Sequence, residues 1–342
     1  MYDLLTGISR DAISLEDFEA AYRDAAVNLS LQGLDYEVLS ALAGAQSAQV
    51  SYRVHYHTAL LGELTRDMIM NLALDLGRWR VQWETGLIMP ELKDGNRLSI
   101  EYKVPARGDI YDRTGKAIAA QADAVALGVE PAKLRKEQEE DLLGVLSKLT
   151  GKTPEDIQSL YTGSKDEYVP VGETTVQEIQ ALYERVDPLS GLVQHPYRSR
   201  YYFEGGVAPQ VTGYVLSIPP EELETYRRNG YRGDEKVGAA GLEKWGESEL
   251  TGKRGAAVYV VSPENKIVTR LAEGKSEPSR FIYTTLERDL KVQAQKAMEG
   301  FKGAIVVLER DSGRILAMVS SPGYDPNLFE PNNTNSAYQL NA

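Results

Sequence analysis

The stretch 104–120, which reads VPARGDIYDRTGKAIAA, constrains the fold more than any other part of the chain. Two short apolar runs flank the turn letters DRTG within it. Gly115 lies where a tight turn needs a positive φ angle, and Asp112 can accept hydrogen bonds from the backbone that follows it. The stretch therefore predicts a β-hairpin. The charges of Arg107, Asp112 and Arg113 predict that ion pairs anchor it.

The composition is that of a globular protein with two or three domains. The chain has 342 residues, of which 42% are hydrophobic and 26% are charged. Its net charge of −12 disfavours a surface for polyanions, so we expect no nucleic-acid partner. Cysteine is absent, which excludes disulfides, thiolate zinc sites and a cysteine nucleophile.

The first hundred residues predict a helix followed by long strands. Ser14 and Asp17 form a capping box, which marks a helix start. The apolar positions that recur at helical spacing after it are Leu15, Phe18, Tyr22, Ala25, Ala26 and Leu29. Three runs of alternating polarity follow, at 50–57, 68–76 and 79–83. This order predicts a curved antiparallel sheet wrapped on helices.

Two pairs of residues in these strands raise the question of a ligand. His55 and His57 share a strand face and could be two ligands of a metal. A zinc site usually needs three or four ligands, and no third one is apparent, so we predict no metal site. Trp79 and Trp83 are interpreted as core residues rather than as a platform for a cofactor.

The middle of the chain alternates strands, helices and glycine-rich turns. We expect a strand at 125–129 and helices at 132–149, from the cap Thr153 onward, and at 174–185. The stretch 237–243 reads VGAAGLE, and its glycines allow tight backbone turns. Its Glu243 is a candidate partner for Arg107 or Arg113. The phosphate-loop pattern G-x-x-x-x-G-K-[ST] does not occur.

The hairpin stretch resembles the R-G-x-I-x-D-R-x-G-x-x-L-A signature of the dimerisation, or pedestal, domain of class B penicillin-binding proteins. The matching residues are Arg107, Gly108, Ile110, Asp112, Arg113, Gly115 and Ala119, with Ile118 in place of the family's leucine. Later stretches resemble further family segments. The first contains Arg200 and has Phe203 where the family usually has a proline. The second contains Gly213 and Tyr214 and has Gln210 where a histidine is common. The third contains Gly238, Gly241 and Glu243. The resemblance implies structural roles for these motif residues.

Both ends of the chain fit the same resemblance. Residues 1–100 resemble the NTF2-like cone of some low-affinity penicillin-binding proteins, and 283–342 resemble the first part of a transpeptidase domain. The resemblance therefore implies an α+β fold in three domains. These are an NTF2-like curved antiparallel sheet with helices (1–100), a dimerisation or pedestal domain (101–282) and a partial transpeptidase fragment (283–342).

The catalytic motifs of that family are missing from this sequence. No serine is followed by a lysine three residues on, and S-x-N and K-[ST]-G are absent. We therefore predict no catalytic residue and no cofactor in this chain. The resemblance implies the non-catalytic extracytoplasmic part of a protein that cross-links peptidoglycan stem peptides by acyl transfer and binds β-lactams.

The same resemblance implies the partners and the location. Peptidoglycan precursors and β-lactams would bind through a transpeptidase domain encoded after residue 342, where S-x-x-K is expected. Other cell-wall synthesis proteins are expected partners. No apolar run reaches the ~20 residues that span a bilayer, so the expected single membrane anchor would precede residue 1.

Two alternatives stay open at this point. The first hundred residues could form an NTF2-like enzyme or small-ligand binder, which requires a deep pocket with convergent acid and base groups. The chain could also be a catalytically dead module that acts only through interactions in the cell wall.

Overall fold

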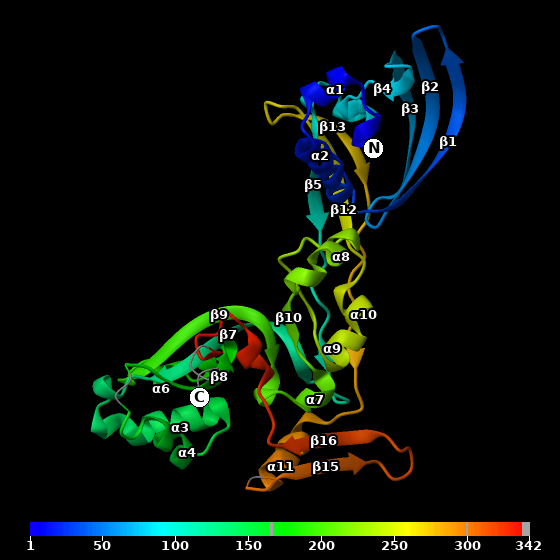
Figure 1. Ribbon diagram of the computed structural model, residues 1–342. Coiled ribbons are helices and arrows are strands. Elements are labelled where there is room, and N and C mark those ends of the chain that lie inside the picture. Colours follow the sequence, from blue (N-terminus) through cyan, green and yellow to red (C-terminus); the bar gives the residue numbers. More distant parts are fainter. Residues whose placement is uncertain (165–166, 299, 337–342) are drawn as a thin grey trace. The chain divides into compact units, whose positions relative to one another are not determined.

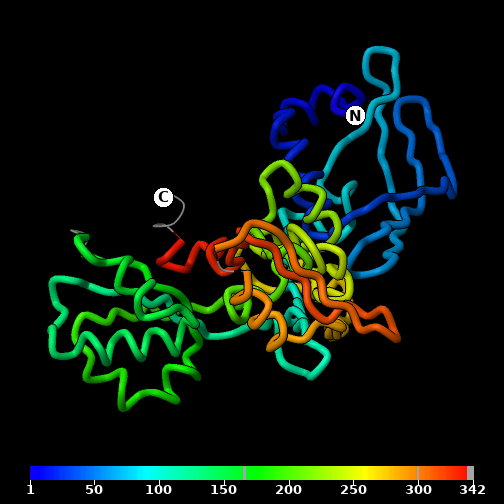
Figure 2. The backbone as a smooth tube through the Cα atoms, turned by 90° about the horizontal axis from the view of Figure 1, so that it is seen from below, coloured from blue at the N-terminus to red at the C-terminus, as the bar shows by residue number. Residues whose placement is uncertain are grey.

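The computed structural model describes residues 1–164, 167–298 and 300–336, and the chain forms two compact units. The first unit comprises Met1–Ala106, Ile218–Glu235 and Gly252–Pro278. The second comprises Arg107–Ser217, Lys236–Thr251 and Ser279–Ala342. Each unit therefore combines segments that are far apart in the sequence, as their colours show (Figure 2). The predicted three-domain division, with boundaries near 100 and 282, stays a prediction.

The first unit contains an antiparallel sheet in the order β1-β2-β3-β4 (Figure 1). Its strands are β1 (Leu31–Ala43), β2 (Ser47–Thr58), β3 (Gly62–Asp75) and β4 (Arg78–Val81). The helices before the sheet are α1 (Gly7–Ala12) and α2 (Leu15–Asn28). Ser14 caps α2 as predicted, because its hydroxyl accepts a hydrogen bond of 3.0 Å from the backbone N–H of Asp17.

A second antiparallel sheet completes this unit. It has the order β13-β12-β5, and its strands are β5 (Arg97–Lys103), β12 (Gly255–Val261) and β13 (Ile267–Glu273). A short helix, α8 (Leu223–Arg228), belongs to the same unit. One apolar core joins α2 to both sheets, and its most buried members include Leu29, Met68, Met89, Val258 and Val260.

Three details of the first hundred residues differ from the predictions. The alternating runs correspond to β2, β3 and β4, but β1 was not predicted. Leu15 leaves half of its surface exposed and is the first residue of α2. Trp79 is also exposed, whereas Trp83 is partly buried and packs against the ring of Phe18.

The predicted hairpin is present in the second unit. It consists of β6 (Ile110–Tyr111) and β7 (Ala117–Val129), and Gly115 in its turn has a φ of +85°. Strand β7 also pairs with β8 (Val169–Thr175) and β9 (Leu192–Tyr202). Strand β6 pairs in parallel with β14 (Ile282–Tyr283), so the late segment enters the hairpin's own sheet.

Helices cover one part of this sheet with an apolar core (Figure 1). They are α3 (Glu139–Thr150), α4 (Pro154–Tyr161), α5 (Val176–Ala181) and α6 (Tyr183–Val186). The helix predicted over 132–149 begins only at Glu139, because the residues after Pro131 form short 3-10 turns. The helix predicted over 174–185 is interrupted at Leu182, where the backbone leaves helical geometry (φ −119°, ψ 16°).

The rest of the second unit is made of short elements and a C-terminal hairpin. The short elements are α7 (Pro209–Thr212), β10 (Val215–Ser217), β11 (Lys236–Gly238), α9 (Gly241–Trp245) and α10 (Glu247–Thr251). After β14 come α11 (Arg288–Ala297), β15 (Gly303–Leu308), β16 (Ile315–Ser321) and the 3-10 turn Pro326–Phe329. Strands β15 and β16 pair as an antiparallel hairpin, and the predicted α+β class is confirmed. Within the described ranges, no helix has the length and apolar character to cross a bilayer.

Candidate functional site

A buried carboxylate, that of Glu243 in the first turn of α9, binds two arginines. Glu243 has no solvent-exposed surface. Its Oε1 accepts a hydrogen bond of 2.7 Å from Nε of Arg200, at the end of β9. Its Oε2 accepts one of 2.8 Å from Nε of Arg107, just before the hairpin. One carboxylate therefore joins three segments that are distant in the sequence.

Further hydrogen bonds extend this cluster, which we call the Glu243 cluster and define as Arg107, Arg200, Glu243 and Glu247. Arg107 donates to Oε2 of Glu247 at 2.9 Å and to the backbone carbonyl of Glu243 at 3.0 Å. Arg200 donates to the carbonyl of Gly108 at 2.8 Å. Burial lowers the pKa of Arg107, but Glu243 and Glu247 outweigh that effect and raise the pKa overall.

Two glycines let backbone segments approach each other around the cluster. A Cβ atom on Gly213, whose φ is +75°, would lie 1.9 Å from the carbonyl oxygen of Ala240. One on Gly238 would lie 2.1 Å from the carbonyl oxygen of Glu243. A side chain at either position would therefore collide with the backbone around Glu243.

Two other motif residues flank the same loop. Gly241 is the first residue of α9, two positions before Glu243. Tyr214 accepts a backbone hydrogen bond of 2.9 Å from Ala239, and its ring packs 4.4 Å from that of Phe329. The motif residues that are scattered over the sequence are therefore largely brought together, with Gly108 contributing its carbonyl to Arg200.

Asp112 forms a second buried anion in the hairpin turn. Its Oδ1 accepts from the backbone N–H of Thr114 at 2.7 Å and of Lys116 at 2.9 Å. Its Oδ2 accepts from the backbone N–H of Arg288, at the start of α11, at 3.0 Å. Burial alone would raise the pKa of Asp112, but the hydrogen bonds from Arg288, Thr114 and Lys116 outweigh it and lower the pKa.

The two hairpin arginines have different partners. Arg107 binds Glu243, one of the pairings expected from the sequence. Arg113 instead lies 3.6 Å from Glu309, and both side chains are about one-third exposed. Asp112 pairs with neither arginine, because backbone N–H groups and the Thr114 hydroxyl occupy its oxygens. Sequence reasoning did not assign Arg200 and Glu247 to the cluster, although Arg200 opens one of the resembling segments.

The first unit contains an apolar groove of about 450 Å³ on the inner side of its curved sheet. The groove is lined by aliphatic and aromatic side chains, which include Phe18, Tyr36, Tyr52, Met70 and Trp83. No histidine, carboxylate or lysine is among its lining residues. It can therefore hold apolar groups.

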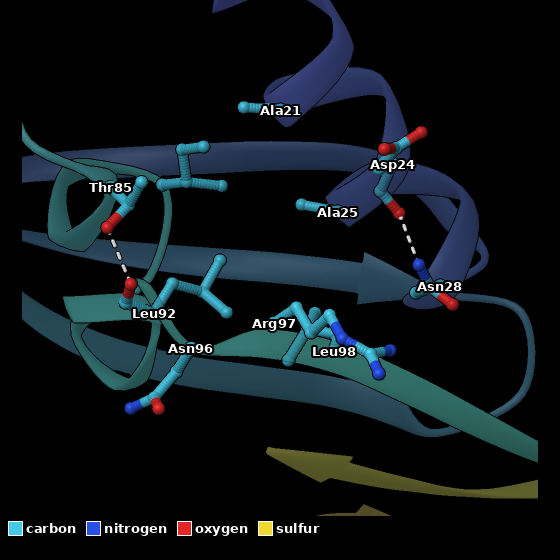
Figure 3. Close-up of a pocket in the computed structure, with 10 residues that line it drawn as sticks. Ala21, Asp24, Ala25, Asn28, Thr85, Leu92, Asn96, Arg97 and Leu98 are labelled. Atoms are coloured by element: carbon cyan, nitrogen blue, oxygen red, sulfur yellow. Dashed lines mark hydrogen bonds between the residues drawn. The ribbon is translucent and has the colours of Figure 1, made fainter. Parts of the chain in front are cut away.

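A smaller pocket of about 300 Å³ lies between α2 and β5 (Figure 3). Asp24 and Arg97 are its charged lining residues, and Asn28 uses its amide to bind the Asp24 carbonyl at 2.8 Å. His55 and His57 lie elsewhere, 2.9 Å from Glu63 and Asp35 respectively. Among the residues with described positions, no group of three or more His, Cys, Asp or Glu side chains is arranged to hold a metal ion.

Comparisons with known proteins agree on two matching families. Residues 102–284 match the family described as "Penicillin-binding Protein dimerisation domain". Residues 1–96 match the "NTF2-like N-terminal transpeptidase domain".

Relatives include penicillin-binding protein 3 of Bacillus subtilis, which is 28% identical over 96% of this chain and 50% of its own length. The peptidoglycan D,D-transpeptidase MrdA of Acinetobacter baumannii is 30% identical over 69% of this chain and 36% of its own length. The chain thus spans half the length of these curated relatives, or less. A solved complex of penicillin-binding protein PBP2 with MreC from Helicobacter pylori is 24% identical, with a TM-score of 0.43 over 71% of this chain and 47% of that chain.

Proposed function

The chain belongs to the penicillin-binding proteins, and on that basis we propose that it is the non-catalytic, extracytoplasmic portion of a class B-type peptidoglycan transpeptidase. In this proposal the segment from 283 onward is the beginning of the catalytic domain. The intact protein would cross-link stem peptides by acyl transfer from a D-Ala-D-Ala end and would be acylated by β-lactams. This chain would supply the support on which that domain is built.

The observation that carries the proposal is the direct link between the hairpin and the late segment. Asp112 in the hairpin turn binds the N–H of Arg288, and β14 extends the sheet of β6 and β7. The first helix of the late segment is therefore fixed at its N-terminus by a buried carboxylate of the pedestal region. Such a joint would transmit a fixed orientation to a domain that follows it.

Partners and location follow from the same proposal. Relatives of this chain are named peptidoglycan D,D-transpeptidases. We propose that this chain meets other cell-wall synthesis proteins, outside the cytoplasm. Attachment to the membrane would come from an anchor segment of the intact protein.

A penicillin-labelling experiment tests the proposal. The chain 1–342 and the complete product of its gene are each incubated with a fluorescent β-lactam and analysed by intact-mass spectrometry. We expect no adduct on 1–342 and one adduct on the complete product, at a serine followed by lysine three residues later. A stable drug adduct on 1–342 would contradict the assignment. A complete product that takes no label would leave only the catalytically dead interaction module.

A small-ligand binder is the second candidate, and the apolar groove favours it over an NTF2-like enzyme. Trp83 lines that groove, so a bound apolar molecule would change its fluorescence. Titration with an apolar dye, compared between the native chain and Trp83→Phe, would test this function. Saturable binding with a Trp83-dependent signal supports a binder, and a linear, non-saturating response argues against it.

A further inference from the structure

The C-terminal segment 325–336, called the strap below, lies along β8 and β9 of the second unit (Figure 1, red). The side chain of Asn327 accepts from the backbone N–H of Tyr202 at 2.9 Å and donates to its carbonyl at 2.8 Å. The side chain of Asn335 donates to the carbonyl of Gly172 at 3.0 Å. Asparagine side chains therefore replace the backbone pairing that a further strand would make.

Two carboxyl groups face each other under the strap. Glu173 of β8 accepts from the amides of Asn333 at 3.1 Å and Asn335 at 2.8 Å, both on its Oε1. Asp325 accepts from the backbone N–H and the side-chain amide of Asn327, each at 2.9 Å and both on its Oδ1. The two carboxyl groups lie within hydrogen-bonding reach of each other. Two carboxylates this close share one proton more readily than they both ionise.

Other titratable groups face the pair from every element packed on it. They are Lys152 after α3, Tyr197 and Tyr201 on β9, Glu204 with its partner Arg288, Lys291 on α11, and Glu330 with its partner Lys236. Lys152 and Lys291 each donate to a backbone carbonyl, at 2.6 and 2.7 Å. Among the ion pairs between described residues, none joins a cation to Glu173 or Asp325. The pair is therefore not neutralised by a salt bridge.

Solvent has a route to the pair. A polar cavity of about 270 Å³ is lined by both carboxyl groups together with Lys152, Tyr201 and Glu204. Protons can therefore exchange with Glu173 and Asp325 while the strap stays in place.

We propose that Glu173 and Asp325 share one proton and form a pH-sensitive latch, which holds the strap on β8 while the proton is bound and loosens it when the proton leaves. With the proton present, one carboxyl group donates to the other. Without it, two neighbouring negative charges repel each other across the junction of strap and sheet. This inference depends only on contacts within the second unit and does not rest on the proposed function.

The direction of the effect follows from the titration of Asp325. Burial, followed by the charge of Glu173, raises the pKa of Asp325 from its ordinary 3.8 to about 7 in the closed state. Because the pKa of Asp325 is raised in the closed state, the closed strap is most stable at a pH below 3.8, the ordinary pKa of this group. The stability of the closed strap then decreases as the pH rises toward 7. Opening of the strap should increase up to about tenfold per pH unit in that window and level off above it.

Hydrogen exchange of the strap tests the latch. The chain 1–342 is exchanged at pH 5.5 and pH 8.0, and the rates are corrected for the intrinsic dependence of amide exchange on pH. We expect peptides covering 327–336 to open at least about tenfold more at pH 8.0, with no matching change in peptides of β7. Asp325→Asn should abolish this difference, because its amide can donate to Glu173 at either pH.

Asp311→Asn is the matched control, since Asp311 is exposed in the β15–β16 turn and should leave the pH dependence unchanged. If Asp325→Asn folds poorly, Glu173→Gln is the second variant, and it should likewise abolish the pH dependence of strap opening. Equal protection of the native strap at both pH values would overturn the latch. So would a native-like pH dependence in a folded Asp325→Asn or Glu173→Gln protein.

Discussion

Arg200 and Glu243 form an ion pair of 2.7 Å between Nε and Oε1, and almost no surface of either residue reaches solvent. The same carboxylate also binds Arg107, so two guanidinium groups depend on one buried anion. Removing one partner of a buried ion pair leaves an unpaired buried charge, which lowers the free energy of unfolding far more than the loss of a surface ion pair does. The stability of the second unit should therefore be unusually sensitive to residue 243.

Glu243→Ala should destabilise the second unit by about 3–5 kcal/mol, because it removes the buried carboxylate that binds Arg107 and Arg200, and Glu247 stays beside Arg107 alone. Arg107→Ala should fall in the same range, and Arg113→Ala should cost less than about 1 kcal/mol, since its pair is partly exposed. Thermal melts of the three variants measure these differences. Glu249→Ala, which breaks an exposed pair with Arg280, is the control. Similar melting temperatures for Glu243→Ala and Glu249→Ala would show that the cluster is not an anchor.

Gly213→Ala should destabilise the chain more than Gly115→Ala. Both glycines have positive φ angles, so alanine is strained at either position, by roughly 1–3 kcal/mol at Gly213, whose φ of +75° and ψ of −156° are essentially restricted to glycine. Only Gly213 would also drive its Cβ into the carbonyl of Ala240, whereas nothing lies within 4 Å of a Cβ at Gly115. Urea unfolding of the two variants provides the comparison. Equal midpoints would mean that the loop of Ala240 can move aside at little cost.

Asp112→Asn should reduce stability at neutral pH and have a smaller effect in acid. Because hydrogen bonds lower the pKa of Asp112 in the folded chain, its ionised form contributes stability above its ordinary pKa of 3.8. That contribution is lost as the pH falls through the lower folded value. Unfolding free energies of the native chain and the variant at pH 7 and pH 3 test the sign. A difference that grows toward pH 3 would be the opposite of this expectation.

Ser14→Ala should destabilise α2 by about 1 kcal/mol, because the N–H of Asp17 loses its acceptor. Ser14→Asp restores an acceptor at the same position and should recover most of the loss. Hydrogen exchange of residues 15–28 measures the local effect. If alanine and aspartate behave alike, the cap does not contribute to the stability of this helix.

The sequence predicts local structure where the signal is local. The hairpin with Gly115, the cap Ser14 and the helix after Thr153 each depend on residues within a few positions of one another, and each is present in the structure. Strand β1 is not predicted although its residues 34–38 alternate, because the alternation breaks at Val38 and Leu39, where the pairing with β2 shifts its register.

The candidate site was only partly predictable, because its contacts join distant parts of the chain. The sequence motifs predict that Glu243 pairs with Arg107 or Arg113, but they do not indicate which of the two arginines it is. Asp112 accepts a hydrogen bond from the backbone N–H of Arg288, which is distant in the sequence, and no local pattern predicts that partner. Arg200 binds Glu243 from β9, at the position that pairs with Gln121 of β7, and such a pairing of distant strands is not visible in a local pattern.

The late arrival of β12 in the first unit has a consequence for synthesis. Leu98 of β5 pairs with Val260 of β12, so the apolar core of the early residues closes only after the ribosome has added much of the chain. At a synthesis rate of ~5–20 residues per second, the edge of β5 stays unpaired for on the order of ten seconds before β12 is made. An open strand edge beside an uncovered apolar core invites pairing with other chains. A truncated product that ends near residue 106 would retain this exposed edge permanently and should aggregate, whereas the longer chain protects itself.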